Sequence, residues 1–412
     1  MIPTEDLRTV ANRFLRLASR VVLVSLLLLS WVGTAQGLVR LRVALLREAS
    51  TFEVTSQEAL RVYAIQQTRL MRELRGGEKL SFRWSRGKIF LNGEGLPVDT
   101  IRLKTIAAPI LLNGVPYRGG LDLLPDGDQG LVVVNEVELE DYLRGVVGRE
   151  MPATWPPEAL RAQAVAARTF ALLLRARSTP RPYDLTAGTG DQVYGGIEAE
   201  HPSVDEAVQA TAGLVLTFRG VLARTFFHAS AAGHTEDVSV VWPGIDEPYL
   251  KGLRLPFDDA GPRHRWESVL SFQGLEDLLQ RAGHKIRGVR QLKTRGKTPS
   301  GRVAQVVIQH QGGSLKLSAH RFRHLVGPSR IRSTFFRLEV GGRRIRFLGV
   351  GNGHGVGMSQ WGAYQMAKEG KSFEEILAFF YPGTQSRRAE EGTLPTGPPL
   401  SEESEDLGAF LR

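Results

Sequence analysis

One glutamate stands where a β-rich run of the sequence gives way to a predicted helix. Glu150 lies within GVVGREMPATWPPEALRAQAVAARTFAL, residues 145–172. A carboxyl group is the side chain best suited to donate a proton to a leaving oxygen and to take one back, provided its pKa is near the working pH. Glutamates at such junctions are more often solvated or cap a helix. The rest of the chain must therefore decide whether Glu150 does chemistry.

Three other polar clusters place His or Gln among small residues. They are GDQVYGG (190–196), FFHASAAGHTEDVSVVWPG (226–244) and GNGHGVGMSQWGAY (351–364). Small residues let a substrate approach the backbone closely. The glycines match neither GxGxxG nor a P-loop, so they do not indicate a phosphate site. Gln360 and Trp361 are better suited to a sugar, because amides bond hydroxyls and an indole stacks on a sugar face.

The histidines and serines fit no standard catalytic or metal-binding motif. His228 and His234 lie six residues apart and His354 is distant, which is not a zinc spacing. The chain has no cysteine, which excludes disulfides, thiolate nucleophiles and Cys-based zinc sites. Ser230 and Ser359 lack a GxSxG elbow, which disfavours a serine hydrolase. A metal-dependent amidase built on the three histidines remains an alternative, although we expect no metal.

The element beside Glu150 is predicted to be a long helix over about 156–177. Thr154 is its candidate cap, and Pro156 and Pro157 suit a first turn, where their missing N–H groups cost nothing. Apolar residues at alternating steps of four and three give one buried stripe, and its alanines allow close packing. Arg168 lies mid-helix, where it can anchor a carboxylate beneath the site.

Strand patterns dominate the first third of the chain, and the ends differ in composition from the rest. Strands are expected at 38–46 and 51–56, with a hairpin over 79–93. Residues 253–346 are predicted to form a peripheral subregion with a helix around LEDLLQRAG and alternating segments such as RVAQVVIQH. The tail, 386–412, is rich in Pro, Gly, Ser and acidic residues and is predicted to be disordered.

Composition and the N-terminus favour an exported globular protein. The 412 residues are 42% apolar, enough for a core. Residues 1–35 hold arginines, an apolar run and then small residues, as a signal peptide does, or alternatively an uncleaved membrane anchor. The net charge of +10 suits an anionic polymer or surface. Export and the absence of a recognisable nucleic-acid module argue against nucleic acid as a partner.

Together these motifs resemble the SpoIID/LytB family, which contains stage II sporulation protein D and amidase enhancers. The resemblance rests on four ordered stretches: NEVELEDYLRGVVGREMPATWPPEALRAQAVAARTFAL, DQVYGG, FFHASAAGHTEDVSVVWPG followed by PYLKG, and GNGHGVGMSQWGAYQMAKEGKSFEEILAFFYPGT. It runs from about residue 38 to 384. It implies a peptidoglycan lytic transglycosylase domain over 36–385, located in the cell envelope, with an α+β fold of mixed, mostly antiparallel sheets and the long helix beside a glycan-binding cleft.

The resemblance also assigns roles to residues. The glutamate of the EMP motif is the family's catalytic acid and falls on Glu150; no cofactor is implied. Zinc bound by cysteines in some members has no counterpart here. The family also lines its cleft with the tyrosine of the DQVY motif, here Tyr194, and with the motif around His228 and His234. With the polar residues of the other motifs added, the substrate-binding groups that we expect are Arg168, Gln192, Tyr194, His228, Ser230, His234, Thr235, Glu236, His354, Ser359 and Gln360. Asp237 is a further candidate helper.

A single acid requires a raised pKa, which sets expectations for the nearby cations. Because a cation lowers the pKa of a carboxyl group, we expect Arg149 to face solvent and Arg168 to pair with another acid, such as Asp191 or Glu236. The main alternative is a non-catalytic glycan-binding protein that enhances a cell-wall N-acetylmuramoyl-L-alanine amidase, which would then be its partner.

Overall fold

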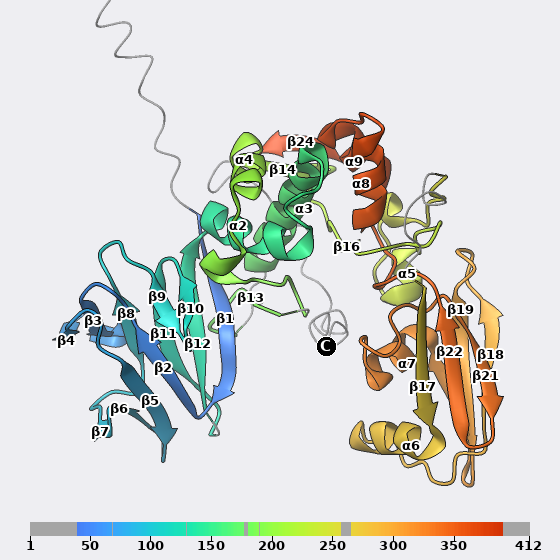
Figure 1. Ribbon diagram of the computed structural model, residues 1–412, viewed down its shortest axis with the longest axis horizontal. Coiled ribbons are helices and arrows are strands. Elements are labelled where there is room, and N and C mark those ends of the chain that lie inside the picture. Colours follow the sequence, from blue (N-terminus) through green and yellow to red (C-terminus); the bar gives the residue numbers. More distant parts are fainter. Residues whose placement is uncertain are drawn as a thin grey trace, which may run out of the picture.

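The computed structural model describes residues 39–67, 69–128, 130–176, 180–188, 190–256 and 265–389. The expected leader at 1–35 and nearly all of the expected tail lie outside these residues. Figure 1 shows three parts: a β-rich part, a helical middle and a second mixed part, and the chain returns to the middle after the second mixed part. The content is mixed α and β with mostly antiparallel pairing, as the sequence predicts.

The first part consists of two sheets around an apolar core. The seven-stranded sheet has the order β13-β1-β12-β11-β8-β3-β4, and the six-stranded sheet has the order β10-β9-β2-β5-β6-β7. Only β1 and β13 pair in parallel within these two sheets. The strands are β1 Arg40–Ala49, β2 Thr51–Thr55, β3 Leu60–Ala64, β4 Arg69–Leu74, β5 Leu80–Ser85, β6 Lys88–Leu91, β7 Glu94–Gly95, β8 Ile101–Lys104, β9 Ile110–Leu112, β10 Val115–Tyr117, β11 Gly120–Asp126, β12 Gly130–Glu138 and β13 Leu185–Thr186, with the short 3₁₀ helix η1 Ile65–Gln67.

The hairpin predicted at 79–93 is confirmed as β5 and β6. Its two-residue turn is Arg86 and Gly87, both with positive φ, at 52° and 73°. Two left-handed residues define the turn whose twist matches that of the flanking strands. Glycine adopts this conformation without strain, whereas an arginine rarely does.

The helical middle is centred on α3, Pro157–Arg175, which is buried around most of its circumference. Its alanines let α2 Leu139–Glu150, α4 Pro202–Ala210, α8 Gln360–Lys368 and α9 Phe373–Phe380 pack against it, as Figure 1 shows. The helix is confirmed, but Thr154 is not its cap: Pro156 occupies that position without a side-chain hydrogen bond.

Short strands and turns complete the middle. They are β14 Leu214–Phe218, β15 Val221–Leu222, β16 Phe227–His228, β23 Met358–Ser359 and β24 Gln385–Arg388, with η2 Gly196–Ala199, α5 Val238–Val241 and η3 Pro248–Leu250. Pairing of β24 with β14 carries regular structure past the boundary expected at 385. No strand forms between β15 and β16, over residues 223–226.

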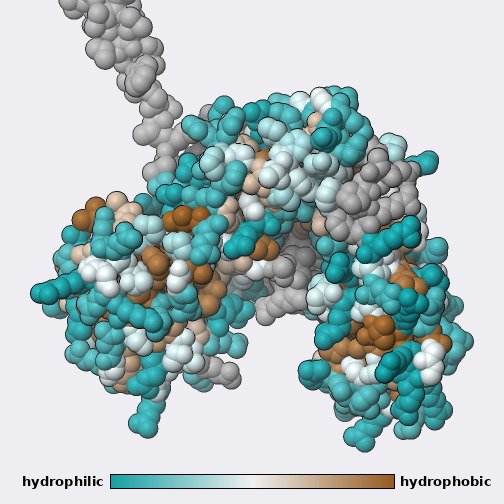
Figure 2. Space-filling model, in the orientation of Figure 1, coloured by the Kyte–Doolittle hydropathy of each residue, from teal (hydrophilic) through white to brown (hydrophobic). Residues whose placement is uncertain are grey.

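The second mixed part has its own core and two three-stranded sheets. Its elements are β17 Trp266–Ser271, α6 Phe272–Arg281, β18 Gln291–Lys297, β19 Val303–His310, β20 Gly313–Ser318, α7 Ala319–Val326, β21 Phe336–Gly341 and β22 Arg344–Gly349. The expected helix and the alternating strand are therefore present as α6 and β19. Figure 2 shows the β-rich part and this part hanging on either side of the helical middle, with a hollow between them.

None of the helices in the described ranges is long and apolar enough to cross a membrane.

Candidate functional site

Glu150 is the last residue of α2, and neutral donors surround its carboxylate. The backbone N–H of Val193 donates to Oε1 at 3.1 Å, and Nε2 of Gln360 donates to Oε2 at 3.2 Å. These donors lie 43 and 210 residues away in sequence. Glu150 therefore lies where the 190–196 loop and the start of α8 meet the end of α2.

Burial raises the pKa of Glu150, and the two hydrogen bonds oppose that rise only in part. Val146, Val147 and Met151, which lie close to Glu150 in the sequence, are all buried. Since burial disfavours the charged form, this carboxyl group retains its proton to a higher pH than an exposed glutamate does. No charged group is among the causes of the shift.

Neither Arg149 nor Arg168 contributes to the pKa shift of Glu150. Arg149 is exposed, as predicted. Arg168 is 0% exposed and binds both carboxylate oxygens of Glu140, at 2.8 and 2.7 Å. It does pair with another acid, but the expected partners were wrong: Asp191 accepts from Thr186 instead. Arg168 is thus a buried tie between α3 and α2, out of reach of a ligand.

The side-chain amide of Gln163 lies next to that of Gln360. Nε2 of Gln360 also lies 3.5 Å from Oε1 of Gln163, a residue of α3 that is 0% exposed. Nε2 of Gln163 has no hydrogen-bond partner. Two facing amides can turn over together, because each carries an NH2 group that donates and a carbonyl oxygen that accepts, and the turn exchanges the two positions. Gln360 can thus donate to an ionised Glu150 or accept from a protonated one. Sequence reasoning missed Gln163, which looks like one more residue of a buried helix.

Three aromatic rings pack together beside this site. Trp155 lies 4.7 Å from Trp361 and 4.9 Å from Tyr364, measured between ring centroids. Trp155 follows α2 by five residues, and Trp361 is the neighbour of Gln360. All three rings keep part of their surface in solvent. Partly exposed aromatic faces next to a carboxyl group suit the apolar face of a sugar.

The 190–196 loop serves the site through its backbone. Gln192 is buried, bonded to the hydroxyl of Tyr142 and the carbonyl of Ala167. Tyr194 is 6% exposed and donates to Asn135. Neither side chain is available to a ligand, contrary to the expectation for both. Together they hold the loop so that its Val193 N–H points at Glu150.

Two glycines of α2 allow the loop to come this close. A Cβ on Gly145 would overlap the ring of Tyr194, and one on Gly148 would overlap the carbonyl oxygen of Ala199. The GVVG sequence is therefore a packing surface for the segment that carries Val193.

The polar residues of 226–244 and the cap of α8 are mostly structural. Ser359 caps α8 and also accepts from Ala231 N–H. Thr235 accepts from Leu253 N–H. Glu236 is buried and accepts from Thr298 and Ser300. Ser230 pairs through its backbone with Asn352, and Asp237 caps α5. These residues fix the motif and do not reach Glu150.

Two of the three candidate histidines come together. The rings of His228 and His354 lie 5.4 Å apart, whereas Nδ1 of His234 contacts the carbonyl of Thr235 at 2.6 Å. Within the described ranges, no three His, Asp or Glu side chains are grouped as metal ligands. The site that sequence motifs suggest therefore separates into Glu150 with Gln360, and a histidine pair elsewhere.

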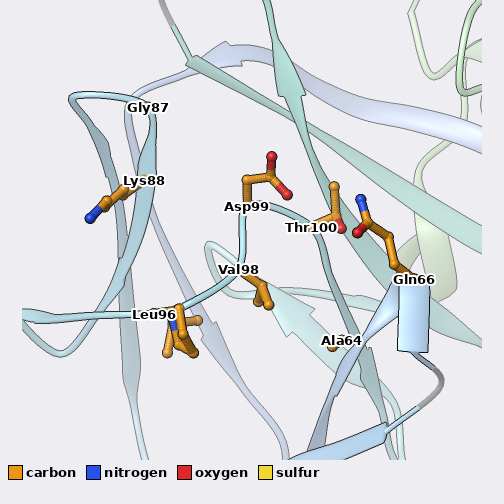
Figure 3. A pocket seen from close by; sticks show the side chains of 9 residues that line it. Ala64, Gln66, Gly87, Lys88, Leu96, Val98, Asp99 and Thr100 are labelled. Atoms are coloured by element: carbon orange, nitrogen blue, oxygen red, sulfur yellow. The ribbon is translucent and has the colours of Figure 1, made fainter.

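A pocket in the first β-rich part contains none of these residues. It is lined by Ala64, Gln66, Gly87, Lys88, Leu96, Pro97, Val98, Asp99 and Thr100. Figure 3 shows Gln66 and Thr100 side by side and Lys88 pointing away from them. None of the residues that the sequence motifs single out lines this pocket, so it is separate from the site of Glu150.

Two family models match the chain. Residues 127–218 match the model described as stage II sporulation protein, and residues 253–357 match a domain of unknown function, DUF8618. The first covers α2, α3 and the 190–196 loop, and so includes Glu150. The second covers the second mixed part.

Curated proteins with similar sequences include two from Bacillus subtilis. Stage II sporulation protein D of that organism is 34% identical over 273 residues, which cover 62% of this chain and 76% of the relative. Its amidase enhancer is 30% identical over 290 residues, or 59% of this chain and 40% of that protein. An uncharacterised protein of Brachyspira hyodysenteriae is 36% identical over 275 residues, 66% of this chain and 72% of its own.

Proposed function

Because the chain belongs to the family of stage II sporulation protein D, we propose that it is an exported peptidoglycan lytic transglycosylase in which Glu150 is the single acid and base. The observation that carries the proposal is the setting of Glu150. Its carboxyl group is half-buried and held by two neutral donors, its pKa is raised, and no charged group is among the causes of that shift.

The reaction needs one carboxyl group acting twice. Protonated Glu150 gives its proton to the glycosidic oxygen as the bond to C1 of muramic acid breaks. The carboxylate then takes the proton of the 6-hydroxyl group as that oxygen bonds to C1, which leaves a 1,6-anhydro end and restores the acid. Ordinary glycosidases use a second carboxylate to activate water or to attack the sugar. Since the attacking oxygen here belongs to the substrate, a second carboxylate has no role.

The surroundings of Glu150 support both halves of this cycle. Gln360 and the Val193 N–H stabilise the carboxylate once the proton has left, while burial favours the protonated form at the start. The rings of Trp155, Trp361 and Tyr364 are suited to stack against sugars on the neighbouring side.

The second candidate function is a glycan-binding enhancer of a cell-wall amidase. It is favoured by the similarity to a protein named amidase enhancer and by the same aromatic rings, which would hold a glycan without cleaving it. A pure binder has no use for a desolvated acid, which is why we prefer catalysis.

Mass spectrometry of soluble products separates the two functions. The purified protein and Glu150→Gln are incubated with intact and with peptide-stripped peptidoglycan. Glu198→Gln is the matched control, because Glu198 is exposed and loses the same charge. Anhydro-muramic ends from the wild type and the control, but not from Glu150→Gln, would support the proposal. Co-sedimentation with the wall without any released fragment would favour the binder.

A further inference from the structure

A group of basic side chains collects where the second mixed part meets the helical middle, apart from Glu150. The middle contributes His228 and His354, and the second part contributes Arg302, His320 and Arg323. We call these five residues the junction cluster. Each of the three histidines interacts electrostatically with Arg302 and with Arg323. Figure 1 shows α7, which carries Arg323, on the side of the second mixed part that faces the hollow between the two outer parts.

Arg323 is a half-buried cation with no carboxylate partner among the described residues. Burial lowers its pKa to about 10, and no carboxylate is among the causes. Its Nε donates to the carbonyl of Arg332 at 3.3 Å, and no acidic residue in the described part of the chain forms an ion pair with it. Even partial removal of a charge from water is costly unless the charge is paired, so this guanidinium favours an anion beside it.

His228 supplies a second, independent observation. It is 4% exposed, and its Nδ1 contacts the carbonyl of Val356 at 3.1 Å, which assigns the proton to that nitrogen. Its Nε2 is buried with no hydrogen-bond partner. Buried polar atoms are seldom left unmatched. In this tautomer Nε2 is an acceptor, so it would be matched by the O–H of a hydrogen phosphate or of a water molecule bound with the anion.

Hydrogen bonds hold other members of the junction cluster in place, and solvent can reach the cluster from one side. Both ring nitrogens of His354 have hydrogen-bond partners: Nδ1 accepts from Val356 N–H, and Nε2 contacts the carbonyl of Phe227. Arg302 donates to the carbonyls of Ala231 and His234, at 2.7 Å each, which ties the two parts together. His320, Arg323 and His354 are only half-buried, so solvent reaches the cluster along them.

We propose that the junction cluster binds an oxyanion, a carboxylate or a phosphate, carried by a wall polymer. A guanidinium offers a planar pair of N–H donors that matches either group. The carboxylate would be that of a muramic acid, and the phosphate that of a phosphodiester polymer. Binding of an oxyanion stands on the geometry of the cluster alone; the identity of its carrier rests on the proposed function.

Thermal unfolding and calorimetry of the full chain test the site at constant ionic strength. The probes are N-acetylmuramic acid, its methyl ester, inorganic phosphate and neutral N-acetylglucosamine. We expect a raised Tm and measurable binding with the free acid or with phosphate, and neither effect with the ester or the neutral sugar. A response to the free acid alone assigns the carboxylate, and one to phosphate alone assigns the phosphate. No response to either anion overturns the proposal without the need for any variant.

A charge-matched pair of variants then locates the site. We expect Arg323→Gln to weaken binding of the responding anion by about tenfold or more, since hydrogen bonds to charged groups contribute roughly 1.5–3 kcal/mol. Arg330→Gln removes the same charge from an exposed position nearby and should bind as the wild type does. Equal losses in both variants would reduce the effect to overall charge and refute the site. Glu150→Gln should bind the anion normally, so failure of the cleavage proposal and failure of this one are separable.

Discussion

At the scale of the residue, the protonation of Glu150 links stability to pH. Its pKa is raised above the ordinary value of 4.5, so between the two pKa values the folded chain binds more protons than the unfolded chain. Stability must then fall as pH rises through that interval. Glu150→Gln mimics the protonated form and should escape this loss.

We therefore expect Glu150→Gln to be more stable than the wild type at neutral pH, by about 1.4 kcal/mol for each unit of pKa shift. The difference should vanish below pH 4, where both forms are neutral. Urea unfolding of both proteins at a series of pH values measures it. Curves that stay parallel at all pH values would show that Glu150 is not desolvated.

Gln360 should set the pKa of Glu150 during turnover. Its Nε2 donates to the carboxylate and lowers the pKa, so Gln360→Leu should raise that pKa further. The alkaline limb of the pH profile of kcat/KM should move to higher pH, with a lower maximum because the carboxylate form loses a donor.

Gln365→Leu is the control for this shift. Gln365 lies on the same helix but donates to Glu369 at the surface. Its profile should match the wild type, and an unmoved alkaline limb in Gln360→Leu would separate Gln360 from the acid.

At the scale of the element, α2 works by letting a loop approach its backbone. Replacing a helical glycine with alanine ordinarily stabilises a helix by about 1 kcal/mol. At Gly148 the added Cβ would overlap the carbonyl of Ala199, so we expect Gly148→Ala to destabilise the fold by about 1–3 kcal/mol instead. The sign of the change in chemical denaturation is the test, since a stabilised variant would contradict the packing described for the loop.

Many of the helices and strands were predictable from sequence, and the contacts between them were not. The alanine stripe and the two prolines predict α3, and local periodicity predicts the hairpin, α6 and β19. The partner of Arg168 and the burial of Tyr194 depend on which helices meet, and no local pattern specifies that. The sequence also could not show whether Ser359 caps a helix or binds a ligand, because serine commonly does either.

At the scale of the whole molecule, Arg302 joins the second mixed part to the helical middle. Arg302→Met would leave the carbonyls of Ala231 and His234 without their donor. At about 1–3 kcal/mol for each unsatisfied group, we expect the two carbonyls to cost roughly 2–6 kcal/mol of unfolding free energy. Differential scanning calorimetry should show one transition in the wild type and two in the variant. A single transition at an unchanged temperature would mean that other contacts hold the parts together.

The residues that form the site of Glu150 are synthesised far apart in time. A ribosome makes the glutamate first and the glutamine that completes its setting 210 residues later. At about 5–20 residues per second, that interval is on the order of tens of seconds. Throughout it, the growing chain carries the carboxyl group without α8 and without two of the three aromatic rings. A protein proposed to cut the wall is in this way unable to assemble its cutting site until most of its length exists.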